Sequence, residues 1–392
     1  MSYDIQLATA RKPAPEHVED WIRTRSDIRV SDATGPNGMG LVIHRRGLFR
    51  RGAIATADGP IHAEAGDLSD TLLSGLLSPR WLMEFQLHGS SVQSDLPVIE
   101  ALAIHLARAC DGAVFDPQRE LLLWPVTPVR EAVRRSDRRI PLITLKWFLP
   151  TSRLVSPLPS ELLEVLRDVC PKALPRRYGT YEPLQHRFEG DGADAAFAAF
   201  WDEEATVVHG STFFWTTTRP VLGGSATLPD QRDIYRPPGV RRVASLDLDI
   251  DGSTVGSQPA WLERTVEVFR AVAERFDAVF AHAYVRRNVL LKRQIWFTPD
   301  SEQYPLPKGG WFRGLPAVPT WLAWYGPAYR TEIEASLPEA VTTRVGPALL
   351  VRWGNEPMNL DALRSVPQLD PRLVVPDPEA DGRPAEFVPQ LE

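Results

Sequence analysis

VASLDLDID (243–251) is the stretch that decides the fold, because its apolar and polar residues alternate strictly. Leu246, Leu248 and Ile250 fall on one side of an extended chain. The other side carries Ser245, Asp247, Asp249 and Asp251. A period of two is typical of a strand with one buried face. We therefore predict a strand here, with three carboxylates on its polar face.

The residues that follow predict a helix and a second strand. WLERTVEVFRAVAERF (261–276) places apolar residues at helical spacing, with charged residues between them. The segment 278–297 is rich in aromatic and branched residues and favours a long strand. Strand, amphipathic helix and strand form a module in which a helix covers a sheet. Because both patterns recur elsewhere, we predict an α+β protein whose sheets are mostly antiparallel or mixed and are covered by amphipathic helices.

The chain is long enough for two domains. A length of 392 residues exceeds one ordinary core. Strand and helix patterns in 1–125 predict a small α+β domain, and those in 140–365 predict a larger one. Between them, 126–139 holds five arginines and predicts a basic linker. Residues 366–392 contain six prolines and six acidic residues, which predicts a disordered acidic tail.

Composition narrows the possible functions. A hydrophobic share of 43% and a charged share of 24% are typical of a soluble globular protein. The net charge of −6 argues against nucleic-acid binding, because phosphate contacts need clustered Lys and Arg. No apolar run approaches the roughly 18–20 residues of a membrane helix. Residues 1–15 lack the parts of a signal peptide, and Cys110 and Cys170 show no ligand spacing, so we expect a cytoplasmic protein.

The three aspartates of the first strand carry the strongest hint of chemistry. Carboxylates at i and i+2 on a strand hold paired Mg²⁺ or Mn²⁺ ions in nucleotidyl-transfer and phosphodiester enzymes. LGGS (222–225) is similar to the Gly-Ser turn of nucleotidyltransferases, but a proline-containing segment separates it from the aspartates. DLDIDG (247–252) also matches half of a calcium loop, although Gln258 stands where a Glu ligand is needed. The simplest interpretation is a solvated polar face. Its charges would then be neutralised across the sheet by Arg286, Arg287, Lys292 or Arg293.

Other catalytic and nucleotide-binding motifs are absent from the sequence. Its eight histidines are scattered, and it contains no HExxH, GxxxxGK[ST] or Gly-x-Ser-x-Gly pattern. The sequence therefore offers no catalytic residue outside the aspartate strand. A binding role is favoured over an enzymatic one.

The aromatic stretch GGWFRGLPAVPTWLAWYGPAY (309–329) suggests a binding surface. Its prolines and glycines favour a loop followed by one or two helical turns. Large rings on a stiff loop bring contact area at little cost in entropy. The candidate binding residues are therefore Trp311, Trp321, Trp324 and Tyr325, and at least one of the three tryptophans should be partly exposed.

Three segments of the second half resemble a known class of proteins. RRYGTYEP (176–183), GLPAVPTWLAWYGPAY (314–329) and GPALLVRWGNEP (346–357) are similar in style to bacterial immunity proteins of type VI secretion and polymorphic toxin systems. The resemblance covers about residues 140–360. It implies an α+β domain that neutralises a toxin by binding, with no catalytic residue and no cofactor.

The sequence thus predicts a non-catalytic, toxin-neutralising protein that acts by surface occlusion of its partner. The alternative is a metal-dependent nucleotidyl-transfer or phosphodiester enzyme that uses Asp247, Asp249 and Asp251. A cleft beside these aspartates favours the enzyme, whereas salt bridges at them favour a binding protein.

Overall fold

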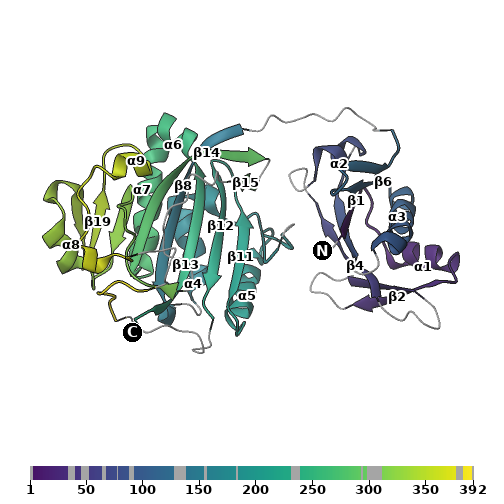
Figure 1. Ribbon diagram of the computed structural model, residues 1–392, viewed down its shortest axis with the longest axis horizontal. Coiled ribbons are helices and arrows are strands. Elements are labelled where there is room, and N and C mark those ends of the chain that lie inside the picture. The colour runs from purple at the N-terminus through teal and green to yellow at the C-terminus, as the bar shows by residue number, and fades with distance from the viewer. Residues whose placement is uncertain are drawn as a thin grey trace. The chain divides into compact units, whose positions relative to one another are not determined.

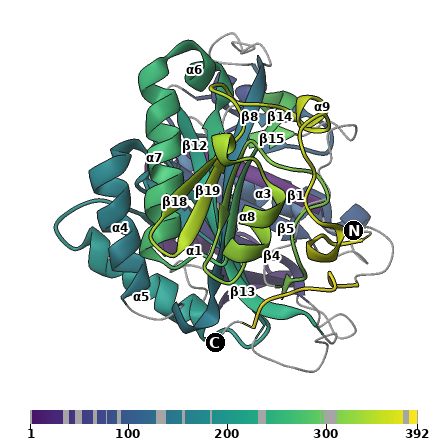
Figure 2. The ribbon, with the colours of Figure 1, turned by 90° about the vertical axis from the view of Figure 1, so that its left-hand side faces the viewer.

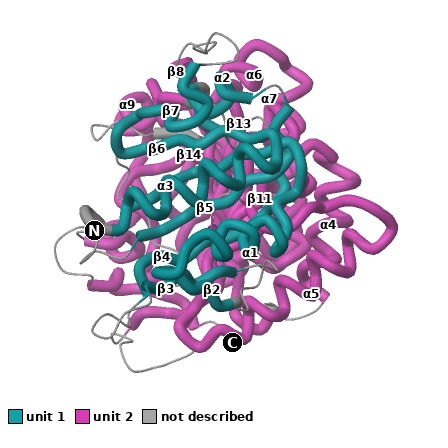
Figure 3. Tube along the Cα trace, turned by 90° about the vertical axis from the view of Figure 1, so that its right-hand side faces the viewer, with its two compact units in different colours: residues 1–136 teal, residues 137–392 magenta. Residues whose placement is uncertain are grey.

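The computed structural model divides into two compact units, Met1–Ser136 and Asp137–Glu392 (Figure 3). The unit boundary falls within the predicted linker at 126–139, most of which lies outside the described residues. The structure describes residues 3–33, 40–45, 53–63, 68–76, 78–87, 92–127, 138–153, 157–181, 184–230, 239–292, 295–297, 311–376 and 383–390.

Unit 1 is built on a seven-stranded sheet in the order β2-β3-β4-β5-β1-β6-β7 (Figure 1), and every neighbouring pair is antiparallel. Its strands are β1 (Tyr3–Thr9), β2 (Ile28–Ala33), β3 (Gly40–Arg45), β4 (Ala53–His62), β5 (Trp81–Leu87), β6 (Gly112–Asp116) and β7 (Leu121–Trp124). Its helices are α1 (Pro15–Arg23), α2 (Asp70–Ser74) and α3 (Val92–Ala109).

Helices cover both faces of this sheet because its central strands are apolar on both sides. Leu7 and Met83 pack with the buried residues of α1 and α3. Their chain neighbours Ala8 and Leu82 point the other way and pack with Leu72 of α2. The sheet is therefore buried between α1 and α3 on one side and α2 on the other.

Unit 2 is built on a larger sheet, also antiparallel, whose main path runs β10-β9-β11-β12-β13-β8-β14-β17-β19-β18. Two short strands lie off this path, with β15 paired to β14 and β16 to β13. The strands are β8 (Arg138–Pro150), β9 (Arg177–Gly179), β10 (His186–Arg187), β11 (Ser211–Thr216), β12 (Val221–Leu228), β13 (Arg241–Asp251), β14 (Phe280–Lys292), β15 (Ile295–Phe297), β16 (Trp311–Phe312), β17 (Leu322–Tyr325), β18 (Thr342–Val345) and β19 (Ala348–Arg352). The α-helices are α4 (Leu158–Val169), α5 (Ala193–Ala205), α6 (Gly252–Ser257), α7 (Pro259–Arg275), α8 (Arg330–Ser336) and α9 (Leu360–Leu363).

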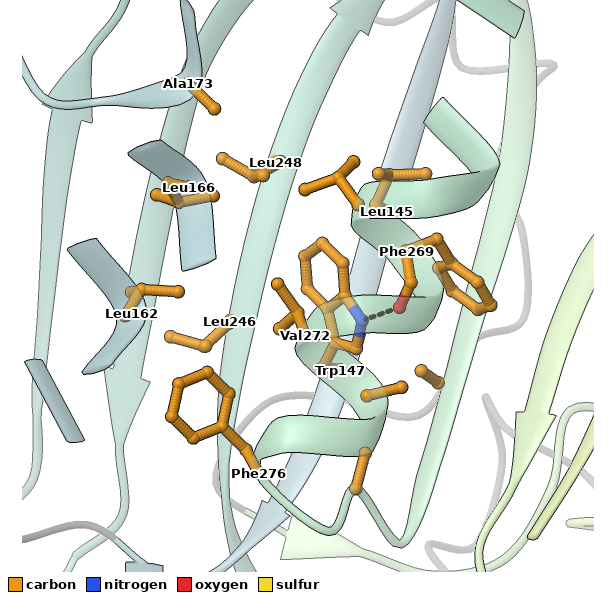
Figure 4. Packing of buried hydrophobic residues seen from close by; sticks show 14 of the residues in the cluster. Leu145, Trp147, Leu162, Leu166, Ala173, Leu246, Leu248, Phe269, Val272 and Phe276 are labelled. Atoms are coloured by element: carbon orange, nitrogen blue, oxygen red, sulfur yellow. Dashed lines mark hydrogen bonds between the residues drawn. The ribbon is translucent and has the colours of Figure 1, made fainter. Parts of the chain in front are cut away.

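Helices α4, α5 and α7 lie together on one face of the large sheet (Figure 2). Leu246 and Leu248 point into the core beneath them, as the alternation in β13 predicts. Trp147 of β8 lies at the centre, and its indole N–H donates to the Phe269 carbonyl oxygen of α7 at 2.9 Å (Figure 4). The predicted strand–helix–strand module is thus β13, α7 and β14, with α6 as an additional turn of helix before α7.

One end of the opposite face is covered by α8, α9 and the residues that follow them. Phe148 and Tyr325 from the sheet pack there with Ile333 of α8, Leu363 of α9 and Leu373. The Leu315 N–H also donates to the Leu373 carbonyl oxygen at 2.9 Å.

The prediction of a disordered tail is wrong for the described part of 366–392. Leu373 is only 1% exposed and Ala385 only 6%. Apart from a short 3-10 helix at Pro371–Leu373, its described residues form no regular helix or strand, and its scattered apolar residues enter the core without helical or strand periodicity. A prediction from composition alone therefore misses that this segment buries apolar residues.

The predicted α+β class, with two sheets covered by helices, is confirmed. The prediction for WLAWY (321–325) is corrected, because Leu322–Tyr325 form strand β17 rather than helical turns. Both faces of that strand are buried, so no polar residue marks its period. None of the described helices combines the length and apolar character that a membrane span requires.

Candidate functional site

The aspartate strand β13 lies in the interior of the large sheet, between β12 and β8. Cross-strand pairing places Ser225, Asp247, Lys146 and His282 side by side in one row. The next row contains Gly223, Asp249, Thr144 and Tyr284. We call these two rows the polar stripe. It lies on the sheet face opposite α4, α5 and α7, and three strands besides β13 contribute to it.

Asp247 forms an ion pair with Lys146 of the neighbouring strand. The Lys146 ammonium nitrogen lies 2.9 Å from both carboxylate oxygens. The two side chains are 14% and 16% exposed, so the pair is largely shielded from water. Ser225 adds a weaker contact at 3.5 Å. The predicted solvated face is therefore wrong at this position, because the chain supplies a cation 101 residues away that the local sequence does not reveal.

Asp249 is the carboxylate of the stripe whose charge is less well compensated. Its side chain is 13% exposed, accepts a hydrogen bond from the Thr144 hydroxyl and lies 3.9 Å from the Arg286 guanidinium. Burial raises the pKa of this carboxyl to about 6, and Arg286 and the Thr144 hydroxyl oppose the rise. The predicted neutralisation by Arg286 thus occurs, but at a distance that leaves burial as the stronger effect.

We expect the stability of Asp249→Asn relative to the wild type to increase as the pH rises. The folded chain holds the Asp249 proton to about pH 6, whereas the ordinary pKa is 3.8. The wild type therefore loses stability between those two pH values, and the amide variant does not. The difference in unfolding free energy between variant and wild type should shift in the variant's favour by roughly 2–3 kcal/mol from pH 4 to pH 7. Urea unfolding at a series of pH values measures it.

Asp370→Asn provides the control for this experiment. Hydrogen bonding to Arg372 lowers the pKa of the exposed Asp370 carboxyl, so this variant should lose stability relative to the wild type as the pH rises. A difference between Asp249→Asn and wild type that does not vary with pH would show that Asp249 is ionised without penalty.

Asp251 has a structural role. Its carboxylate accepts from the Ser253 N–H at 3.0 Å and caps α6, and Arg138 lies 3.3 Å away. The segment DLDIDG (247–252) is therefore a strand followed by a helix cap rather than a calcium loop. LGGS (222–225) is likewise the interior of β12 and not a turn.

Each aspartate of β13 thus has its own partners. In the described parts of the chain, no three His, Cys, Asp or Glu side chains converge as a metal site requires. Of the remaining cation candidates, Arg287 pairs with Asp361 at 2.6 Å. Lys292 and Arg293 have no described side chains. Salt bridges at the aspartates favour the binding interpretation over the enzymatic one.

Four members of the polar stripe were missed by the sequence analysis, namely Lys146, His282, Thr144 and Tyr284. His282 is fully buried, and neither ring nitrogen has a hydrogen-bond partner among the described residues. Burial and the nearby Lys146 lower the pKa of this imidazole to about 3, so it is neutral. The rings of Phe148 and Phe280 lie 5.8 and 5.3 Å away, centre to centre, and form its apolar surroundings. No motif signals this histidine, because Lys146 and Phe148 come from another strand, β8.

Three of the four predicted aromatic contact residues are in the core. Trp321, Trp324 and Tyr325 are 0%, 3% and 3% exposed, so they cannot contact a partner of the folded chain. Trp311, in β16, is half-buried, which matches the expectation of one partly exposed ring. Trp324 and Tyr325 are buried because β17 lies between β14 and β19, and Trp321, the residue before β17, packs in the main core of the large sheet.

An exposed aromatic residue does occur at the end of the same row of the sheet. Phe214 of β11 pairs with Ser225 and is 42% exposed, whereas its chain neighbours Phe213 and Trp215 point into the core under the helices. Thr212 and Thr227 lie on the same face and contact each other through their hydroxyl oxygens at 3.2 Å. We call Thr212, Phe214, Ser225 and Thr227 the β11–β12 face.

Comparison with known proteins gives a distant structural neighbour. Neither a family model nor a curated protein matches this chain. The Pseudomonas aeruginosa T6SS protein PA0821 matches with a TM-score of 0.36 and 13% sequence identity, over 56% of this chain and 67% of that protein.

Proposed function

We propose that this chain is a non-catalytic, toxin-neutralising protein of the immunity type, which covers its partner with the β11–β12 face. The exposed Phe214 is the observation that carries the proposal. It stands on a sheet face whose other members carry hydroxyl groups. A large ring surrounded by hydrogen-bonding groups is the usual composition of a protein interface.

The neighbouring charges support a binding role. Asp247 and Lys146 neutralise each other, so the part of the stripe next to the β11–β12 face presents an ion pair. The strand backbone is fixed by pairing on β12, and an aromatic anchor there loses little entropy when a partner binds. The sequence resemblance to immunity proteins covers this same part of the chain.

The size of a protein interface requires more than these four residues. Stable interfaces bury about 1,200–2,000 Å² in total. Tyr181, Val207 and Val208 are further exposed apolar residues of unit 2, at 43%, 37% and 51%. Tyr181 follows Gly179, which pairs with Phe214, and the two valines precede β11. Tyr181, two residues from the partner of Phe214, is the one we include in the proposed surface.

Phe214→Ala should weaken partner binding by about 2 kcal/mol or more and leave folding stability nearly unchanged. The partner to test is the protein encoded by the neighbouring gene in the source cell, first assayed for toxicity alone and then produced together with this chain. Rescue of growth reports neutralisation, and calorimetry with the purified pair reports affinity. Phe214 is a surface anchor, so its loss removes contact area from the interface and not from the core.

Two matched variants complete this experiment. Phe213→Ala changes the adjacent, fully buried ring and should lower folding stability instead. Leu121→Ala removes an exposed apolar residue of unit 1, 48% exposed, and should leave binding unchanged. Unchanged affinity for Phe214→Ala would show that the interface lies elsewhere on the chain. Failure of the wild type to bind or rescue would overturn the proposed function itself.

A further inference from the structure

Unit 1 contains a cavity of about 430 Å³ that is separate from the polar stripe. It is formed where the last turn of α3 meets the connection after α2 and the end of β7. Leu76, Ala107, Trp124 and Pro125 provide apolar walls. Ser78, Arg108 and Asp111 are its polar lining residues. This volume and this mixture of apolar walls with a few polar groups are typical of a small-molecule site.

Of the two charged groups in the lining, one is already neutralised. Asp111 forms an ion pair with Arg11 at 2.9 Å. Arg11 also donates to the Ala109 carbonyl oxygen at 2.6 Å, and its own N–H donates to the Cys110 carbonyl oxygen. The carbonyl groups at the end of α3 and the Asp111 charge are therefore occupied by Arg11.

Arg108 carries the remaining positive charge. Its guanidinium lies 4.3 Å from the centre of the Trp124 ring. Within the described residues it forms no ion pair and no hydrogen bond. A guanidinium held over a ring keeps its N–H donors available at the edge, where a carboxylate can accept two of them. The cavity thus combines an apolar wall with one unpaired cation.

We propose that this cavity binds a small planar aromatic carboxylate. The ring system would lie against Leu76, Trp124 and Pro125, and the carboxylate would pair with Arg108. The charge of the lining sets this preference, because Asp111 is compensated and Arg108 is not. Two fused rings with one carboxylate fall within the size range of ligands that sites of this volume accept.

Three probes of equal shape test the charge preference. 2-Naphthoate, 2-naphthalenemethanol and protonated 2-naphthylmethylamine carry a negative, a neutral and a positive group on the same rings. Titration calorimetry on the full chain should give an affinity for naphthoate at least ten-fold above that for the alcohol. The amine should bind more weakly than both.

Three variants locate the site. Arg108→Gln should reduce naphthoate affinity to that of the alcohol, and Ser78→Phe, which fills the cavity from its exposed rim, should remove binding of both. Arg25→Gln is the matched control, because Arg25 also lies over a tryptophan, Trp21 at 5.3 Å, but is paired with Asp27. It should bind naphthoate like the wild type. Equal affinity for the three probes, or an Arg108→Gln variant that keeps the preference for naphthoate, would overturn the proposal.

Discussion

Trp321→Ala is expected to destabilise unit 2 by about 3–5 kcal/mol. The ring is fully buried and belongs to the main core of the large sheet. Removing it leaves a cavity that the packed neighbours fill only in part, so the lost contacts and the empty space both lower stability. Urea unfolding of the full chain, followed by circular dichroism, gives the change in unfolding free energy.

Trp311→Ala provides the comparison, because Trp311 comes from the same aromatic stretch and is only half-buried. Its replacement should cost about 1 kcal/mol. The structure thus predicts a clear order between two tryptophans that the sequence treats alike. Equal losses for the two variants would mean that the Trp321 ring is not packed in the core.

The second large effect concerns the Lys146–Asp247 pair. Lys146→Met should cost about 3 kcal/mol, because it leaves the Asp247 carboxylate shielded from water without its cation. The sequence alone predicts the opposite for this strand, namely that changes at Asp247 are nearly neutral. The unfolding free energy of the variant therefore distinguishes a buried pair from a solvated polar face.

The double variant Lys146→Met with Asp247→Leu tests whether the loss comes from leaving one charge unpaired. Removing both partners eliminates the unpaired charge, so most of the loss should be recovered. The interaction between the two sites is then measured by comparing the single and double variants. Additive losses would show that the two side chains act independently, in conflict with the 2.9 Å contact.

The local patterns of the chain predict its secondary structure well where one face is buried. The alternation in 243–251 places the apolar residues of β13 correctly, and the stripe in 261–276 predicts α7 to within two residues of its observed start. Prediction fails where both faces of a strand are buried, as in β17, since no polar residue then marks the period. Prediction also fails for the proline-rich C-terminal segment, because the buried residues of that segment have no period at all.

The candidate site is harder to predict than the fold. The aspartates are visible in the sequence, but their burial is not, since Thr144 and Lys146 come from a strand about 100 residues earlier. Phe214 could have been found from the pattern of β11, where Phe213 and Trp215 share one side and Phe214 takes the other. What the pattern cannot supply is which side receives the helices.

The position of β8 also has a consequence for the order in which the large sheet can assemble. β8 pairs with both β13 and β14, so the module formed by β13, α7 and β14 cannot close its two strands on each other. One edge of β8 stays unpaired until β13 has been synthesised, near residue 250, and the other edge stays unpaired until residues near 290 have been synthesised. Such distant pairings slow folding, and open strand edges attract other chains in the meantime. Nascent chains that stop before β14 are therefore expected to aggregate or to remain bound to chaperones.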